Sequence, residues 1–158
     1  METFYSTLSG ICFTLLGLWW VVVQMNLERW MSTPARRLTA AAASMHFAAP
    51  GLIALVAVMV PEENQIWRVG AVAGGVLGLL VSAYALFAAT LTRGQRIQEA
   101  LMMILFGLIT GLAFVTTPVF GLRPIVVEAL VDVAMLGGGV YFIWLLFLEG
   151  QPADPTAT

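Results

Sequence analysis

The sequence predicts an all-α, polytopic integral membrane protein, a bundle of five transmembrane helices. Of its 158 residues, 60% are hydrophobic and only 10% are charged, and the mean hydropathy is +0.93. Soluble globular domains have fewer apolar and more charged residues. The apolar residues also form continuous runs rather than short alternating segments, which favours helices over a membrane barrel.

Each run has roughly the 20 residues that are needed to cross a hydrocarbon core of about 30 Å. The predicted spans cover residues 5–26, 38–60, 67–91, 98–117 and 125–148. Residues 1–149 then form a single transmembrane helical domain, and the polar residues 150–158 form a disordered tail. The span over 98–117 is the shortest. A re-entrant segment there, which leaves four crossings, is the alternative.

Small and polar residues recur along the first span at spacings of three, four or seven. They are Ser6, Gly10, Thr14, Gly17 and Gln24. Because these residues share a broad face, we expect that face to pack against neighbouring helices. Gln24, close to the cytoplasmic end, is a candidate hydrogen-bonding gate on an ion or proton pathway.

The second span contains the only histidine of the chain, His46, followed four residues later by Pro50. Proline has no N–H group, so it leaves the His46 carbonyl without its helical donor. A titratable ring and a free carbonyl therefore coincide near the middle of the membrane. His46 is a candidate proton relay or ion ligand, with a hydrogen-bonded packing role as the alternative.

The third span carries a small residue at every fourth position, and the fourth span repeats the pattern once. The positions are Gly70, Gly74, Gly78 and Ser82 in the third span, and Gly107 and Gly111 in the fourth. Such a glycine zipper lets backbones approach closely, which holds helices together in lipid. It predicts helix packing within the chain. A subunit interface of a homo-oligomer and a pore lining are the alternatives.

The fifth span begins near Pro124 and carries two acids, Glu128 and Asp132, on one face. Asp132 lies about two turns inside the helix, where a charge costs up to about 2.5 to 3.5 kcal/mol, so it should face protein or water. Two adjacent carboxylates also repel, which favours a proton or a cation between them. The alternatives are an ion or proton pathway, a structural ion pair with Arg68 or Arg123, and a protonated, hydrogen-bonded acid.

The arginines predict the orientation, since the chain has no lysine. Five of the seven lie in the first and third connections, at Arg29, Arg36, Arg37, Arg93 and Arg96. The positive-inside rule therefore places these connections in the cytoplasm, with the N-terminus outside and the C-terminus inside. We expect the protein to reside in the inner (plasma) membrane of a bacterium.

Several function classes have no support in the sequence. We find no zinc-ligand spacing, no phosphate-binding glycine loop and no nucleophile motif, so no metal site, cofactor or enzyme activity is predicted. A basic face for nucleic acid is also missing. Two interpretations remain. The first is a homo-oligomeric channel or transporter subunit for ions, protons or small solutes, and the second is a non-catalytic membrane scaffold or accessory subunit that packs through its glycines, with itself or with another membrane protein.

Overall fold

The structure, a computed structural model, describes residues 1–59, 66–89 and 91–148. In these residues it contains six helices: α1 (Glu2–Met25), α2 (Leu27–Met31), α3 (Pro34–Met59), α4 (Trp67–Ala88), α5 (Arg93–Leu112) and α6 (Pro124–Leu148). The all-α prediction is confirmed. The helix that was not predicted is the short α2, which lies in the first connection. The predicted disordered tail, 150–158, falls outside the described residues.

Four of these helices are long and apolar enough to cross a membrane: α1, α3, α4 and α6. They correspond to the first, second, third and fifth predicted spans. The chain is therefore a small polytopic membrane protein with four candidate membrane-spanning helices.

The fourth predicted span is corrected by the structure. The prediction covers residues 98–117, whereas α5 runs from Arg93 to Leu112. The helix begins early because Thr92 and Gln95 form a capping box, in which each side chain accepts a hydrogen bond from the other residue's backbone N–H. α5 is one unbroken helix of 20 residues, so a re-entrant hairpin is not found at this position.

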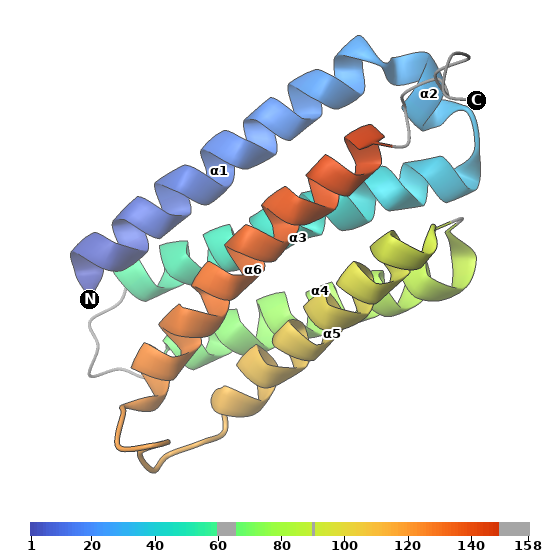
Figure 1. Ribbon diagram of the computed structural model, residues 1–158. Helices are drawn as coiled ribbons and strands as arrows, with labels where there is room; N and C mark the ends of the chain where they lie inside the picture. The colour runs from blue at the N-terminus through green and yellow to red at the C-terminus, as the bar shows by residue number, and fades with distance from the viewer. Residues whose placement is uncertain (60–65, 90, 149–158) are drawn as a thin grey trace, which may run out of the picture.

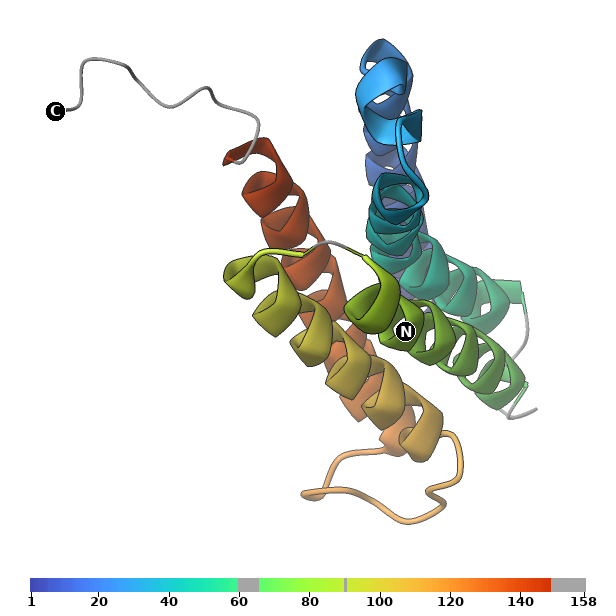
Figure 2. The same ribbon diagram turned by 90° about the vertical axis from the view of Figure 1, so that its right-hand side faces the viewer.

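Successive long helices run in opposite directions along the bundle (Figure 1). The start of α1, the start of α4 and the connection 113–123 lie at one end, which we call the N-terminal end. The opposite end, which we call the C-terminal end, holds α2, the turn after α4 and the end of α6. Figure 2 shows α1 and α3 on one side of the bundle and α5 and α6 on the other. α3 is the central helix, because it packs against α1, α4 and α6.

The glycines of α4 serve two neighbouring helices rather than one. A Cβ added at Gly74 would lie 2.8 Å from the Ile53 side chain of α3. One added at Gly78 would lie 2.2 Å from the Phe106 ring of α5. The row of small residues therefore winds across α4 and lets α3 and α5 approach it from two sides. Gly70 also faces α3, because a Cβ added there would lie 3.1 Å from the Val56 Cβ.

The pair of glycines in α5 behaves differently. A Cβ added at Gly107 would make an ordinary contact of 3.9 Å with Leu79 of α4, and one at Gly111 would meet nothing within 4 Å. Besides Gly78, α4 approaches α5 closely at Gly75, where an added Cβ would lie 2.2 Å from the Thr110 hydroxyl oxygen. Sequence spacing alone did not distinguish these positions.

The polar row of α1 faces outward. Ser6, Gly10, Thr14, Gly17 and Gln24 are all exposed, and a Cβ added at either glycine would meet nothing within 4 Å. The expectation that this face packs against other helices of the same chain is therefore wrong. The side of α1 that does pack carries Tyr5, Leu8, Cys12 and Trp19, which are all buried.

α5 buries polar side chains near its start and exposes apolar ones along its length. Ile97, Leu101 and Ile104 are at least half exposed, whereas Gln98 and Glu99 are buried against the other helices. A helix of a water-soluble protein does not normally bury polar side chains and expose apolar ones in this way. The low hydropathy of α5 comes from these covered side chains and from the exposed Arg93 and Arg96 in its first turn.

Candidate functional site

Glu128 and Asp132 lie on the buried face of α6. Their side chains are 1% and 0% exposed, although the helix as a whole is apolar. The spacing of four residues puts both carboxyl groups one above the other, and they interact directly. Both acids therefore face protein rather than lipid.

Tyr5 of α1 reaches across the bundle to this pair. Its hydroxyl lies 2.5 Å from Glu128 Oε2 and 2.9 Å from the carbonyl oxygen of Ile125. A tyrosine hydroxyl has one proton to donate and two lone pairs that accept. Tyr5 can thus satisfy both neighbours if it donates a hydrogen bond to the Ile125 carbonyl oxygen and accepts one from a protonated Glu128. We call Tyr5, Glu128 and Asp132 the acid cluster.

Asp132 is the unsatisfied member of the acid cluster. Neither of its carboxylate oxygens has a hydrogen-bond donor among the described residues, and Glu128 Oε1 also lacks one. The nearby Cys12 is fully buried beside Gly51 of α3 and offers only a weak thiol donor. A proton between the two carboxyl groups would supply the missing hydrogen bond.

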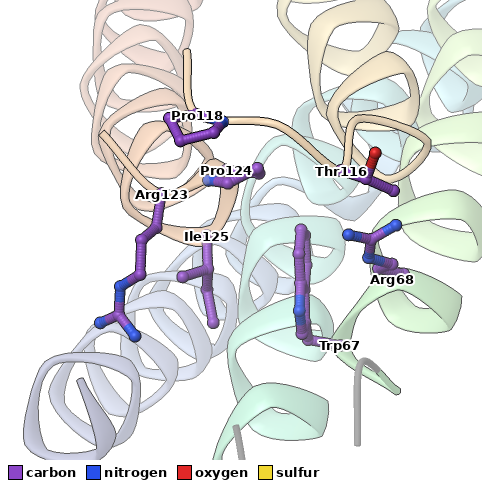
Figure 3. A pocket seen from close by; sticks show the side chains of 7 residues that line it. All are labelled: Trp67, Arg68, Thr116, Pro118, Arg123, Pro124 and Ile125. Atoms are coloured by element: carbon purple, nitrogen blue, oxygen red, sulfur yellow. The ribbon is translucent and has the colours of Figure 1, made fainter. Parts of the chain in front are cut away.

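Neither of the two arginines proposed as ion-pair partners contacts these acids. Arg68 donates a hydrogen bond of 3.0 Å to the Val115 carbonyl oxygen and lies over the Trp67 ring. Arg123 lies at the N-terminal end, immediately before α6, with its side chain directed toward α1 (Figure 3). Within the described part of the chain, the structure holds no ion pair between an arginine and either acid of the cluster.

A second polar cluster lies deeper, toward the C-terminal end. His46 Nε2 of α3 is 3.2 Å from Glu99 Oε2 of α5, and both side chains are fully buried. The distance suits an ion pair, but the N–H of the ring is not directed at the oxygen, so no aligned hydrogen bond forms. The ring of Phe142 packs edge-on against His46, with 4.9 Å between the ring centroids.

The glycines of α6 make room for this second cluster. A Cβ added at Gly139 would lie 3.0 Å from the His46 Cβ, and one at Gly138 would lie 2.8 Å from Gln98 Nε2. Gln98 donates a hydrogen bond of 2.9 Å to the Gly138 carbonyl oxygen. We call His46, Gln98 and Glu99 the histidine cluster. It combines a base, an acid and an amide at one level of the bundle.

The two clusters share one face of α6. Asp132 and Gly139 are seven residues apart, which is two turns or roughly 10 Å along the helix. Met135, fully buried, occupies the intervening turn. The structure therefore brings Asp132 and Glu128 together and places His46 beside the same face of α6, about two turns further along the helix. It leaves Gln24 apart, on the exposed surface of α1.

Three residues of these clusters were not predicted as site residues. Gln98 and Glu99 stand at the start of the predicted span 98–117 and were not singled out. The signal that could have found them is the capping-box pattern at Thr92 and Gln95, which starts a helix before them. Tyr5 stands at the start of the first predicted span, and no pattern in a single sequence reveals its contact with Glu128.

Among the described residues, no three side chains of histidine, cysteine, aspartate or glutamate converge as metal ligands. Comparison of the chain with protein-family models, with curated proteins and with solved structures finds no match.

Proposed function

We propose that this protein is a membrane transport protein that binds protons inside the bilayer, with Asp132 as the main proton-binding group. The observation that carries the proposal is the state of Asp132. It is fully buried in a candidate membrane span, beside a second acid, and both of its oxygens lack a donor. Ionisable residues at such depth are costly and typically belong to ion or proton pathways.

The histidine cluster extends the pathway toward the C-terminal end. Histidine exchanges protons readily near neutral pH, and its neighbour Glu99 is a second proton acceptor. Met135 separates this level from Asp132 with an apolar side chain. The proposed sequence of proton-binding groups is therefore Glu128 and Asp132 first, then Glu99 and His46, with a change of side-chain packing between them.

We propose that α5 is the fifth crossing, with the N-terminal end of the bundle outside the cell. Its 20 residues span about 30 Å, and its outward face is apolar from Ile97 onward. Labelling of introduced cysteines tests this topology, because the native Cys12 is buried. An impermeant reagent outside intact cells should label Thr3→Cys and Thr117→Cys but not Ser32→Cys. Protection of Thr117→Cys would indicate that α5 does not cross.

A non-catalytic membrane subunit is the second candidate. The outward row of α1 favours it, because Gly10 and Gly17 are small and exposed and lie on one face of the helix with Thr14 between them. In lipid, such a face suits close contact with another helix. The same face suits a homo-oligomer, so the number of subunits in the purified protein is informative for both candidates.

A proton-flux assay in proteoliposomes separates the two candidates. A pH-sensitive dye inside the vesicles should report proton movement for the wild type, and Asp132→Asn should slow it at least about tenfold. Glu128→Gln should have a smaller effect. Tyr84→Phe is the matched control, because this side chain is 64% exposed on α4. Full flux in a folded Asp132→Asn variant would overturn the proposal, and absence of flux in the wild type would favour the non-catalytic subunit.

A further inference from the structure

A pocket of about 260 Å³ opens at the N-terminal end of the bundle. Its lining residues are Trp67, Arg68, Thr116, Pro118, Arg123, Pro124 and Ile125, which come from the starts of α4 and α6 and from the connection 113–123. In Figure 3 the Trp67 ring stands between Arg68 on one side and Ile125 on the other. The volume is below the range of about 300 to 1,000 Å³ for drug-sized ligands, so the pocket suits a small molecule.

The electrostatics of the pocket favour an anion. The N-termini of α4 and α6 both border it, and each carries the positive end of a helix dipole. Two arginines contribute side chains, and none of the described lining residues is acidic. Two helix N-termini and the Arg68 side chain therefore place positive potential at one cavity.

Arg68 is prepared to bind a further acceptor. One of its terminal nitrogens is held by the Val115 carbonyl, and its guanidinium group lies 5.5 Å from the centre of the Trp67 ring. Its Nε atom is buried and has no hydrogen-bond partner. The side chain as a whole is only half-buried, and a guanidinium fork fits the two oxygens of a carboxylate or phosphate group. These contacts fix the guanidinium group and leave its other terminal nitrogen to donate to a further acceptor.

We propose that this pocket binds an oxyanion, a carboxylate or a phosphate group, through Arg68. The group belongs either to a small solute or to a lipid headgroup. Ile125 lines the pocket, and its carbonyl oxygen accepts a hydrogen bond from Tyr5 of the acid cluster. If the oxyanion belongs to a small solute, its closeness to the acid cluster suits a substrate that crosses the membrane together with protons. This step rests on the proposed function.

Thermal unfolding of the purified full-length protein tests the oxyanion site. Inorganic phosphate or acetate should raise the unfolding midpoint of the wild type in detergent, and Arg68→Gln should weaken the apparent affinity at least about tenfold. Arg68→Lys keeps the charge but loses the fork, so its affinity should fall between the two. Arg93→Gln is the matched control, because Arg93 is exposed at the opposite end of the bundle.

A second set of unfolding measurements, made on the protein in nanodiscs, identifies the source of the oxyanion. If a lipid headgroup occupies the pocket, phosphatidylglycerol but not pure phosphatidylcholine should stabilise the wild type, and Arg68→Gln should abolish that difference. No stabilisation by phosphate, acetate or phosphatidylglycerol would overturn the site, as would equal stabilisation of wild type and Arg68→Gln. The same anion-binding measurements are repeated with the Asp132→Asn variant. Retained anion binding without proton flux separates this site from the proposed function.

Discussion

The acid cluster and the histidine cluster use the same ingredient, a buried carboxyl group, in two different ways. Glu99 lies 3.2 Å from a base, whereas Asp132 faces a second acid, and neither carboxyl group has an aligned hydrogen-bond donor among the described residues. Both carboxyl groups are fully buried and lie at levels about two helical turns apart. Burial therefore does not distinguish them, and the chemical character of the neighbour does.

This difference determines how strongly the stability of the fold depends on each cluster. Removal of one partner from a buried acid–base pair leaves the other without compensation, so the pair resists change. Two acids together gain nothing from being charged at the same time, and a proton shared between them is readily replaced. We therefore expect variants of the histidine cluster to lower both stability and proton movement, and variants of Asp132 to lower mainly proton movement.

The largest expected effect is that of His46→Ala. The substitution leaves Glu99 buried without its partner, and we expect the free energy of unfolding to fall by about 3 to 5 kcal/mol. Unfolding in mild detergent gives this value. Adding Glu99→Gln should restore part of the loss, since the stranded acid is then removed. Strictly additive losses in the double variant would show that the two side chains are not coupled.

Gly139→Ala should have the next largest effect. The added methyl group would lie 3.0 Å from the His46 Cβ and from the Phe47 ring, so α6 must shift, at a cost of about 1 to 3 kcal/mol. Gly137→Ala, two residues earlier, is the control because nothing lies within 4 Å of its added Cβ. The same unfolding measurement compares them. Equal stability of both variants would contradict the packing of the histidine cluster described above.

Tyr5→Phe tests the acid cluster, the other member of the comparison. It removes the hydroxyl that contacts Glu128 and the Ile125 carbonyl, which leaves buried acceptors unsatisfied. We expect a loss of about 1 to 2 kcal/mol in the free energy of unfolding. Tyr84→Phe, on the exposed side of α4, should change stability by less than about 0.5 kcal/mol. A silent Tyr5→Phe variant would mean that Glu128 does not depend on this hydroxyl.

The smallest effect on stability is expected for Asp132→Asn. An amide replaces a carboxyl group that has no donor, so the free energy of unfolding should change by less than about 1 kcal/mol. The variant is measured beside His46→Ala under the same conditions. A loss as large as that of His46→Ala would indicate that Asp132 has a cationic partner in the folded protein.

The sequence was sufficient for the fold class and for the four most apolar spans, because a membrane span is a local property of about 20 residues. It was insufficient for α5, which covers Gln95, Gln98 and Glu99 against other helices, so its hydropathy understates how apolar its outer face is from Ile97 onward. Gly78 and Gly111 illustrate the same limit, since equal spacing in the sequence led to a tight contact in one case and none in the other.

The candidate site was predicted in the same uneven way. Asp132 and Glu128 are conspicuous in an apolar run, and one helix holds both of them. The contacts of Tyr5 with Glu128 and of His46 with Glu99 join helices far apart in the chain. Such pairings depend on how the helices pack, and no spacing rule within one segment contains that information.

Infrared spectroscopy of the carboxyl groups tests the central claim most directly, because a protonated acid and a carboxylate absorb at different frequencies. The protein in lipid is compared at two pH values, for the wild type and for Asp132→Asn. The account predicts a carboxylic-acid band that changes with pH in the wild type and is lost or strongly reduced in the variant. A pH-dependent band of equal size in both proteins, or its absence from the wild type, would contradict the assignment of Asp132 as the proton-binding group.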